Sequence, residues 1–330
     1  MDFYVTDVNG YEKGMLEHCG VNIVIGEDND FEITVQSKIF DSERHGKKCH
    51  FFCPDTEYGG LIRSIHPVTA DKIVKLTGMT WRGLLNQKAM NPEKNSYIYL
   101  DGEANSLIGN YLQKLNLSEI FQVSKIDSGI TLSNYKVPLQ SMFLDTITAA
   151  LSTQNARLDI KYKQGAANDS GYVVLQAVPI TDSSQSIELN EDGNVNFDIL
   201  DYENGVNHLI CLGSGEVEDR MQVDLYVWPD GSVRKEAYYT GIDVIEKYYE
   251  NSNVETVEEL EEEGRDEIEK LMNYKQLKIS LDGNEDHELG DIVGGRERIT
   301  NICMTAPVVR KIVDVSGNGR TKISYKLKGE

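Results

Sequence analysis

The chain has 330 residues, 40% of them apolar, which is enough to bury a core in more than one domain. Its formal net charge of −21 excludes sequence-independent binding to DNA, which depends on Lys and Arg displacing counterions from phosphates. Residues 191–330 hold 31 acidic and 16 basic side chains, so most of the excess negative charge lies there. The 28 glycines and 17 tyrosines, against 7 prolines, favour many short strands over disorder.

Cysteine usage and the first residues indicate the compartment. Five cysteines are an odd and scattered set, and the opening segment has no basic-then-apolar signal region. We therefore expect a protein that is made and kept reduced in a cytoplasm. No apolar run approaches the roughly 20 residues that span a bilayer, so no membrane segment is predicted. The cysteines are Cys19, Cys49, Cys53, Cys211 and Cys303.

Residues 1–90 are predicted to form a small sheet or barrel. A polar turn at residues 26–30 separates two alternating strands and indicates a hairpin. A short helix is expected at residues 81–88, where Trp81, Leu84 and Leu85 share a face. The expected strands are 2–8, 21–25, 31–35, 58–65 and 72–77.

Residues 91–190 are predicted to form a compact α+β module. Apolar residues recur at helical spacing from Leu107 to Leu115 and from Met142 to Leu151. Strands are expected at 157–163 and 172–178, joined by a glycine-rich turn. The module ends near Ser186.

Residues 191–330 are predicted to form a second sheet-rich domain with a helical insertion at about 241–274. Thr256 and Glu259 form a capping box for the helix. The expected strands are 194–202, 207–213, 221–228, 233–239, 277–281, 291–293, 299–304, 308–315 and 322–327. The fold class is mainly β with α+β insertions: two β-barrel-like domains and a mixed α+β middle domain.

The cluster of residues 49–53, near His45 and His18, contains the side chains that zinc prefers. In a strand, however, Cys49 and Cys53 would lie over ~13 Å apart at ~3.3 Å per residue, too far for one tetrahedral ion. Buried core cysteines are the favoured interpretation, and we predict no metal and no cofactor.

Other short motifs have plain structural interpretations. Asp127-Ser128-Gly129 matches an aspartic protease core, but one copy cannot supply two carboxylates, so a turn is favoured. Residues 282–293 lack the glycine and glutamate of a calcium loop. The acidic run at 258–263 complements a helix dipole, with an exposed or lumen-facing helix that repels DNA as the alternative. No catalytic residue is predicted.

Four segments resemble siphovirus and prophage tail proteins of the baseplate-hub type. They are Thr56-Glu57-Tyr58-Gly59-Gly60-Leu61-Ile62, Thr80-Trp81-Arg82-Gly83-Leu84-Leu85, residues 207–216 around Gly213-Ser214-Gly215 with Asp219-Arg220, and residues 289–295 around Asp291-Ile292-Val293-Gly294-Gly295 with 299–300 and 307–309. Together they run in the family's order from about residue 55 to 315.

The resemblance implies a non-enzymatic homotrimer in the virion tail. Two barrel-like domains per subunit would form a pseudo-sixfold ring that adapts the hexameric tail tube to trimeric tip proteins. Its partners would be tube, distal tail and tip or spike proteins, with DNA passing unbound. The implied structural motif residues are Glu57, Tyr58, Gly59, Gly60, Trp81, Arg82, Gly83, Gly213, Gly215, Asp291, Gly294 and Gly295.

Two alternatives stay open. Family members that cleave peptidoglycan carry added C-terminal domains, and this chain stops after its last strand, which argues against a hydrolase. A pair of cleft carboxylates roughly 5 to 9.5 Å apart, one with a raised pKa, would favour a cell-wall hydrolase. A shallow groove lined by several tyrosines would favour a carbohydrate-binding module.

Overall fold

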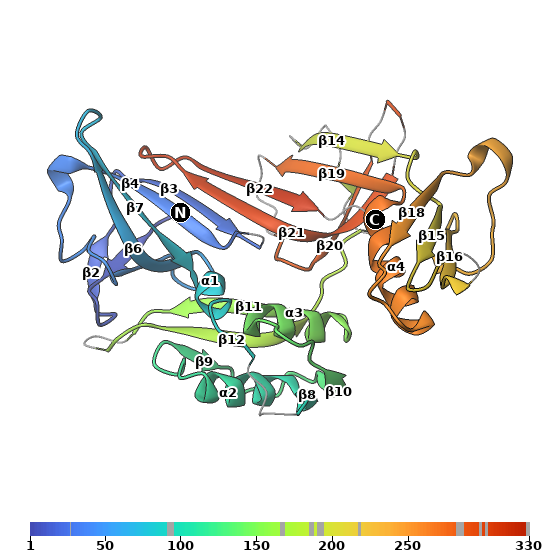
Figure 1. Cartoon of the computed structure of the whole chain (residues 1–330). Helices are drawn as coiled ribbons and strands as arrows, with labels where there is room; N and C mark the ends of the chain where they lie inside the picture. Colours follow the sequence, from blue (N-terminus) through green and yellow to red (C-terminus); the bar gives the residue numbers. More distant parts are fainter. Residues whose placement is uncertain are drawn as a thin grey trace. The chain divides into compact units, whose positions relative to one another are not determined.

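The computed structural model describes residues 1–26, 28–90, 96–165, 169–184, 188–189, 195–216, 219–281, 287–296, 299–300 and 303–327. The chain folds as two compact units (Figure 1). The first contains residues 1–197 and 279–327, and the second contains residues 198–278. None of the helices in the described ranges combines the length and apolar character that a membrane span needs.

A curled half-barrel sheet dominates the first unit (Figure 1). The order of hydrogen-bonded strands within the first unit is β22-β21-β3-β4-β7-β6-β5-β1-β2, with β20 beside β21 and β13 beside β20, while β14 and β19 consist mostly of residues of the second unit. The strands are β1 (Tyr4–Thr6), β2 (Glu12–Met15), β3 (Gly20–Ile25), β4 (Asp30–Gln36), β5 (His50–Phe52), β6 (Gly59–Val68), β7 (Ile73–Thr80), β13 (Glu188–Leu189), β14 (Val195–Tyr202), β19 (Tyr274–Leu281), β20 (Ile292–Arg296), β21 (Cys303–Val315) and β22 (Thr321–Leu327).

Local sequence explains the predicted hairpins of this sheet. In the β3–β4 hairpin, Asn29 adopts a positive φ of 55°, which asparagine tolerates. Its side chain accepts from the Gly26 amide at 2.9 Å and donates to the Gly26 carbonyl at 2.7 Å. Alternating residues of β4 then point into the core, with Ile33 and Val35 fully buried. The expected hairpin is therefore confirmed, and the strands expected at 58–65 and 72–77 correspond to β6 and β7, which pair with each other.

The two ends of the chain share this sheet. Lys311 to Val315 of β21 pair antiparallel with Val21 to Ile25 of β3. The division into domains 1–90, 91–190 and 191–330 did not include this pairing and stays a prediction. Val313 of β21 is fully buried with Ile23 of β3, so side chains from both ends build one core.

Helices and two small sheets form the α+β part of the first unit. Strand β11 pairs antiparallel with β12, which pairs parallel with β9, and β8 pairs with β10. Figure 1 shows α2 and α3 beside these strands. The elements are α1 (Trp81–Leu85), β8 (Tyr99–Glu103), α2 (Ala104–Lys114), β9 (Phe121–Val123), β10 (Thr131–Lys136), α3 (Phe143–Ser152), β11 (Ala156–Lys163) and β12 (Tyr172–Pro179).

Asp127-Ser128-Gly129 lies in the turn between β9 and β10, as predicted. Gly129 has a φ of +70°, and its amide donates to the Asp127 carboxylate at 2.8 Å. That carboxylate therefore closes a turn.

The second unit is a four-stranded sheet, in the order β17-β16-β15-β18, packed against α4 (Val257–Leu271). Thr256 caps α4 by accepting from the Glu259 amide at 3.3 Å. Leu260 and Ile268 are its fully buried contacts with the sheet core. The strands are β15 (His208–Leu212), β16 (Gln222–Val227), β17 (Val233–Arg234) and β18 (Glu246–Glu250).

Strand β18 (Glu246–Glu250) corrects the first part of the helical insertion expected at about 241–274, a range that does contain α4. It pairs parallel with β15 at the edge of the sheet. Three of its side chains are exposed in succession, so the alternation that marks a strand in the sequence is missing. His208 of β15 fixes the strand, since its ring nitrogens lie 2.8 Å from Glu246 of β18 and 2.9 Å from Asp224 of β16.

The buried imidazole of His50 should make the first unit acid-sensitive. Burial lowers the pKa of His50 from its usual 6.5 to about 4. Because the unfolded chain takes up this proton first, stability present above pH 6.5 is lost as pH falls towards 4. We expect the loss from this group to reach about 2 kcal/mol by pH 5.

Urea unfolding at pH 7.5 and pH 5 measures this effect. The transition is followed by tryptophan fluorescence in a Trp228→Phe background, where Trp81 is the only tryptophan. His50→Gln should flatten the pH dependence, whereas His66→Gln, at an exposed position, should not. Equal pH dependence in all three chains would refute the assignment.

Candidate functional site: a buried junction and an adjoining cleft

The motif residues around positions 57 and 82 meet in a buried ion pair. Arg82 of α1 donates through Nε and Nη2 to the two carboxylate oxygens of Glu57, the second at 3.1 Å. Its Nη2 also donates to the carbonyl of Leu158 in β11 at 2.7 Å. Glu57 and Arg82 are only 7% and 5% exposed. One guanidinium thus ties the half-barrel to the α+β part of the same unit.

Burial sets the protonation behaviour of Glu57. Loss of water raises the pKa of its carboxyl to about 7, although the neighbouring Arg82 guanidinium opposes the rise. A raised pKa is the property of a general acid, but Glu57 does not line the cleft described below. We therefore interpret the Glu57 carboxyl as one half of a structural ion pair with Arg82.

Trp81 begins a stack of aromatic rings beside this ion pair. Its ring lies 5.4 Å from that of Tyr162 at an angle of 20°, and Tyr162 stacks on Phe52 at 4.1 Å. The ring of His50 lies perpendicular to that of Trp81, with 5.7 Å between the ring centroids. Trp81 and Phe52 are essentially unexposed, so the stack fills the space between β5, α1 and β11.

The motif glycines let backbones approach at the same junction. A Cβ on Gly59 would lie 2.8 Å from Nε1 of Trp81, and one on Gly60 would overlap the Met79 carbonyl oxygen. A Cβ on Gly83 would overlap the carbonyl of Asn29. Only glycine fits these positions without displacing backbone.

Tyr58 contacts a buried lysine on a distant strand. Nζ of Lys311 in β21 lies 5.0 Å from the Tyr58 ring centroid, and the lysine is 1% exposed. Glu288 lies 3.5 Å from the same ammonium. A cation over an aromatic face with a carboxylate nearby offsets the cost of burial. The N-terminal motif is thereby held to the C-terminal strands.

The remaining motif residues lie elsewhere. Asp291 pairs with Arg157 at 2.9 Å, and a Cβ on Gly294 would come within 2.7 Å of the Ser184 carbonyl. Gly295 pairs with Met304 between β20 and β21. In the second unit, Gly213 packs near Leu260 and Met221, while Gly215 has a φ of +102°, which favours glycine in its turn.

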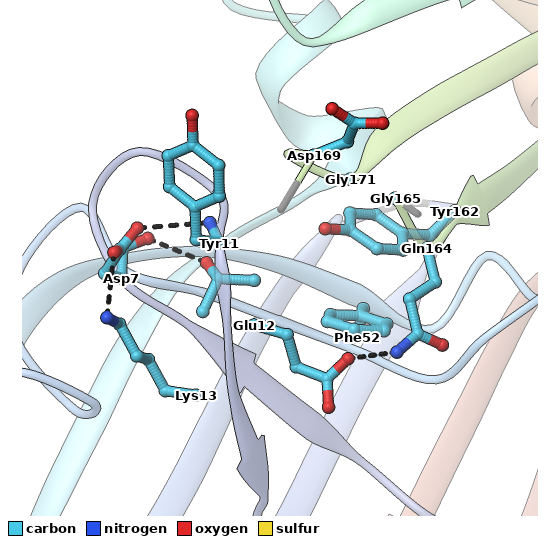
Figure 2. A pocket seen from close by; sticks show the side chains of 12 residues that line it. Asp7, Tyr11, Glu12, Lys13, Phe52, Tyr162, Gln164, Gly165, Asp169 and Gly171 are labelled. Atoms are coloured by element: carbon cyan, nitrogen blue, oxygen red, sulfur yellow. Dashed lines mark hydrogen bonds and ion pairs between the residues drawn. The ribbon is translucent and has the colours of Figure 1, made fainter. Parts of the chain in front are cut away.

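A cleft of about 610 Å³ adjoins the aromatic stack (Figure 2). The turn between β1 and β2 forms one wall, and Gln164, Gly165, Asp169 and Gly171 line the other. The Gly171 amide donates to the Gly10 carbonyl at 3.2 Å and joins the two walls. Gln164 also donates to Glu12 across it. The lining residues are Thr6, Asp7, Gly10, Tyr11, Glu12, Lys13, Phe52, Tyr162, Gln164, Gly165, Asp169 and Gly171.

The carboxylate of Asp7 in this cleft stays ionised. Burial opposes ionisation, but hydrogen bonds from the amides of Tyr11 and Asn9 and from Lys13 outweigh it and lower the pKa of Asp7. Asp7 therefore lacks the raised pKa of a general acid. Of the two lining tyrosines, Tyr11 is 44% exposed and Tyr162 only 1%, so the cleft does not offer several tyrosines to a sugar.

The cysteine cluster does not form a metal centre in the described residues, where no group of three or more potential ligands converges. Cys49 is fully buried and Cys53 half-buried, on either side of β5. His45 accepts from the Asp41 amide at 3.0 Å. Burial raises the pKa of both thiols, which disfavours the thiolate that zinc binds.

Substitution of Arg82 should be strongly destabilising, since it leaves the Glu57 carboxyl buried without its partner. We expect Arg82→Met to lower the free energy of unfolding by about 3–5 kcal/mol and the double variant Glu57→Gln/Arg82→Met to recover part of it. The half-buried pair of Lys75 and Glu32, whose side chains are 36% and 41% exposed, is the matched control, where Lys75→Met should cost under about 1 kcal/mol. Denaturant titration measures both; similar losses at the two pairs would contradict the buried-junction account.

Adding a single methyl group at Gly60 should also destabilise the half-barrel. We expect Gly60→Ala to cost about 1–3 kcal/mol because the Met79 carbonyl must move. Gly20→Ala is the control, since a Cβ there meets nothing closer than 3.8 Å. Thermal unfolding followed by circular dichroism compares the two, and an unchanged midpoint for Gly60→Ala would show that the strands relax freely.

No protein-family model and no curated protein sequence matches this chain. Several solved structures, however, are similar to this chain in fold. The 43 kDa tail protein of prophage MuSo2 from Shewanella oneidensis matches with a TM-score of 0.57 and 10% identity, covering 99% of this chain and 98% of that one. A chain of the phage P2 baseplate in its activated conformation gives a TM-score of 0.52 and 11% identity, covering 99% and 98%.

A tail protein from Neisseria meningitidis MC58 is similar as well, with a TM-score of 0.51 and 12% identity, covering 99% of this chain and 97% of that one. These three likenesses extend over nearly the whole of each chain. They confirm the fold that the sequence resemblance implied: this chain has the mainly β fold of phage and prophage tail and baseplate proteins.

Proposed function

We propose that this protein is a structural, non-enzymatic component of a phage or prophage tail tip. In this role it is a homotrimeric hub that adapts the hexameric tail tube to trimeric tip proteins. The observation that carries the proposal is the fold match, which uses 99% of this chain and 97–98% of the three tail and baseplate chains. Because the shared fold covers almost every residue of this chain and of the three other chains, we infer that all four have a similar structural role.

The trimer follows from the symmetry of the task. Three copies that each contribute two similar parts present six positions to a sixfold tube and three to a threefold tip. We assign the two parts to the sheet-rich regions 1–90 and 191–330, which meet where β3 pairs with β21, with 91–190 between them in the sequence. The motif residues, from Glu57 to Arg82 and from Gly213 to Gly295, would hold this framework together.

The partners and location follow from the same role. Tube and distal tail proteins would bind on one side and tip or spike proteins on the other, in the virion tail after synthesis in the bacterial cytoplasm. Genomic DNA would pass without binding, because the net charge of −21 repels phosphates.

The chemistry of the cleft supports a non-enzymatic role over a hydrolase. A glycosidase needs one carboxyl with a raised pKa opposite an ionised one. In the described cleft Asp7 has a lowered pKa, while burial raises the pKa of Glu57 and of Asp30, neither of which lines the cleft. For the carbohydrate-binding alternative, the cleft offers only one exposed tyrosine among its described lining residues, Tyr11.

The oligomeric state tests this proposal. Light scattering coupled to size exclusion should give a mass about three times the 37.1 kDa chain, alone or after co-expression with the tail-tube protein of the same phage. Electron microscopy of the complex should show a ring with six similar positions. A monomer under both conditions, or sugar cleavage from purified peptidoglycan, would overturn the proposal.

A further inference from the structure

One part of the first unit is cationic although the chain is strongly acidic. Residues 36–48 and 63–75, which we call the cationic hairpin, hold seven Lys or Arg and three Asp or Glu. They comprise the last residue of β4, the 3-10 turn η1 (Ser37–Ile39), the loop after it, the end of β6, the turn that follows and the start of β7 (Figure 1). The Ser37 amide donates to the Lys72 carbonyl at 2.9 Å, so the two segments lie side by side.

Five cations of this hairpin are exposed and have no counter-charge. No ion pair or side-chain hydrogen bond joins them to any residue in the described ranges. The two other cations are engaged, since Lys75 pairs with Glu32 at 2.9 Å and Arg44 donates to the Met15 carbonyl. The five are Lys38, Lys47, Lys48, Arg63 and Lys72. An acidic partner surface would supply the counter-charge that these five cations lack among the described residues.

The second unit carries the complementary charge. Residues 198–278 hold 21 acidic and 8 basic side chains, a net charge of −13. On α4 the exposed carboxylates of Glu258, Glu262, Asp266 and Glu269 follow at helical spacing, on the face opposite buried Leu260 and Ile268. Among the described residues none of these four has an ion-pair partner. Repulsion between carboxylates four residues apart destabilises an isolated helix.

We propose that the cationic hairpin of one copy docks on the acidic α4 face of a second copy. Both surfaces carry unpaired charge of opposite sign, which would steer the encounter and fix its orientation. Two different surfaces meeting head to tail is the arrangement that closes a threefold ring. This inference rests on the proposed trimer and names the contact that holds it. A DNA duplex fits the hairpin less well, because the other charges of the chain repel it.

Charge reversal in both surfaces tests the contact. The hairpin variant is Lys47→Glu/Arg63→Glu, the helix variant is Glu258→Lys/Glu262→Lys, and a third chain combines them. Lys114→Glu/Lys125→Glu, at exposed positions of the α+β part, is the control with the same change in net charge as the hairpin variant. Sedimentation velocity over a concentration series gives the midpoint of trimer formation, and thermal unfolding confirms that each chain is folded.

Each single-surface variant should raise the midpoint concentration by about tenfold or more, and the combined chain should return towards the wild type. The control should behave as the wild type. Added salt should weaken the wild-type trimer, since exposed charges are screened over about 10 Å at 0.1 M.

Other results separate the two proposals. Trimers that form equally well in all variants would overturn the hairpin contact and leave the hub function standing. A wild-type chain that never self-associates, alone or with the tail-tube protein, would overturn both. Trimers unaffected by the hairpin variant, together with loss of binding to a 30-base-pair duplex, would identify the hairpin as a DNA contact instead.

Discussion

The buried contact of Arg82 with Glu57 and the Leu158 carbonyl is the constraint around which the first unit is organised. A guanidinium cannot be left in an apolar interior without acceptors, so the segment before β6, helix α1 and strand β11 must meet at one point. The aromatic stack of Trp81 and Tyr162 can then fill the space beside it. The half-barrel and the α+β part are therefore fixed by a polar contact and not by apolar packing alone.

This constraint explains why glycine-rich motifs in a structural protein need not mark a binding loop. Gly59 and Gly60 lie between β5 and β7, where the neighbouring backbone and the Trp81 ring leave no room for a Cβ. The same segment supplies Glu57 to the ion pair and Tyr58 to Lys311. A run of four residues thus contacts α1, β5, β7 and β21, and each contact restricts which side chain is allowed.

The sequence predicted the elements whose cause is local. The β3–β4 hairpin follows from a turn at Asn29 flanked by alternating strands, and α4 from its Thr256 cap. It did not predict the pairing of β21 with β3, because nothing near either strand encodes a partner almost 290 residues away. Nor did it predict β18, whose mostly exposed residues lack alternation. The contact between Arg82 and Leu158 was also missed. Its acceptor is a backbone carbonyl, which no pattern of side chains marks in the sequence.

Charge segregation within one chain also limits how copies can meet. A twofold contact through the cationic hairpin would bring Lys47 and Arg63 against their own images, and one through α4 would do the same with Glu258 and Glu262. Both arrangements place like charges together, which costs free energy at an interface. The whole-chain charge of −21 hides this pattern, because the cationic segments are averaged with a far larger acidic remainder. Only when hairpin and helix are counted separately does the sequence favour a directional, ring-closing contact over a symmetric pair.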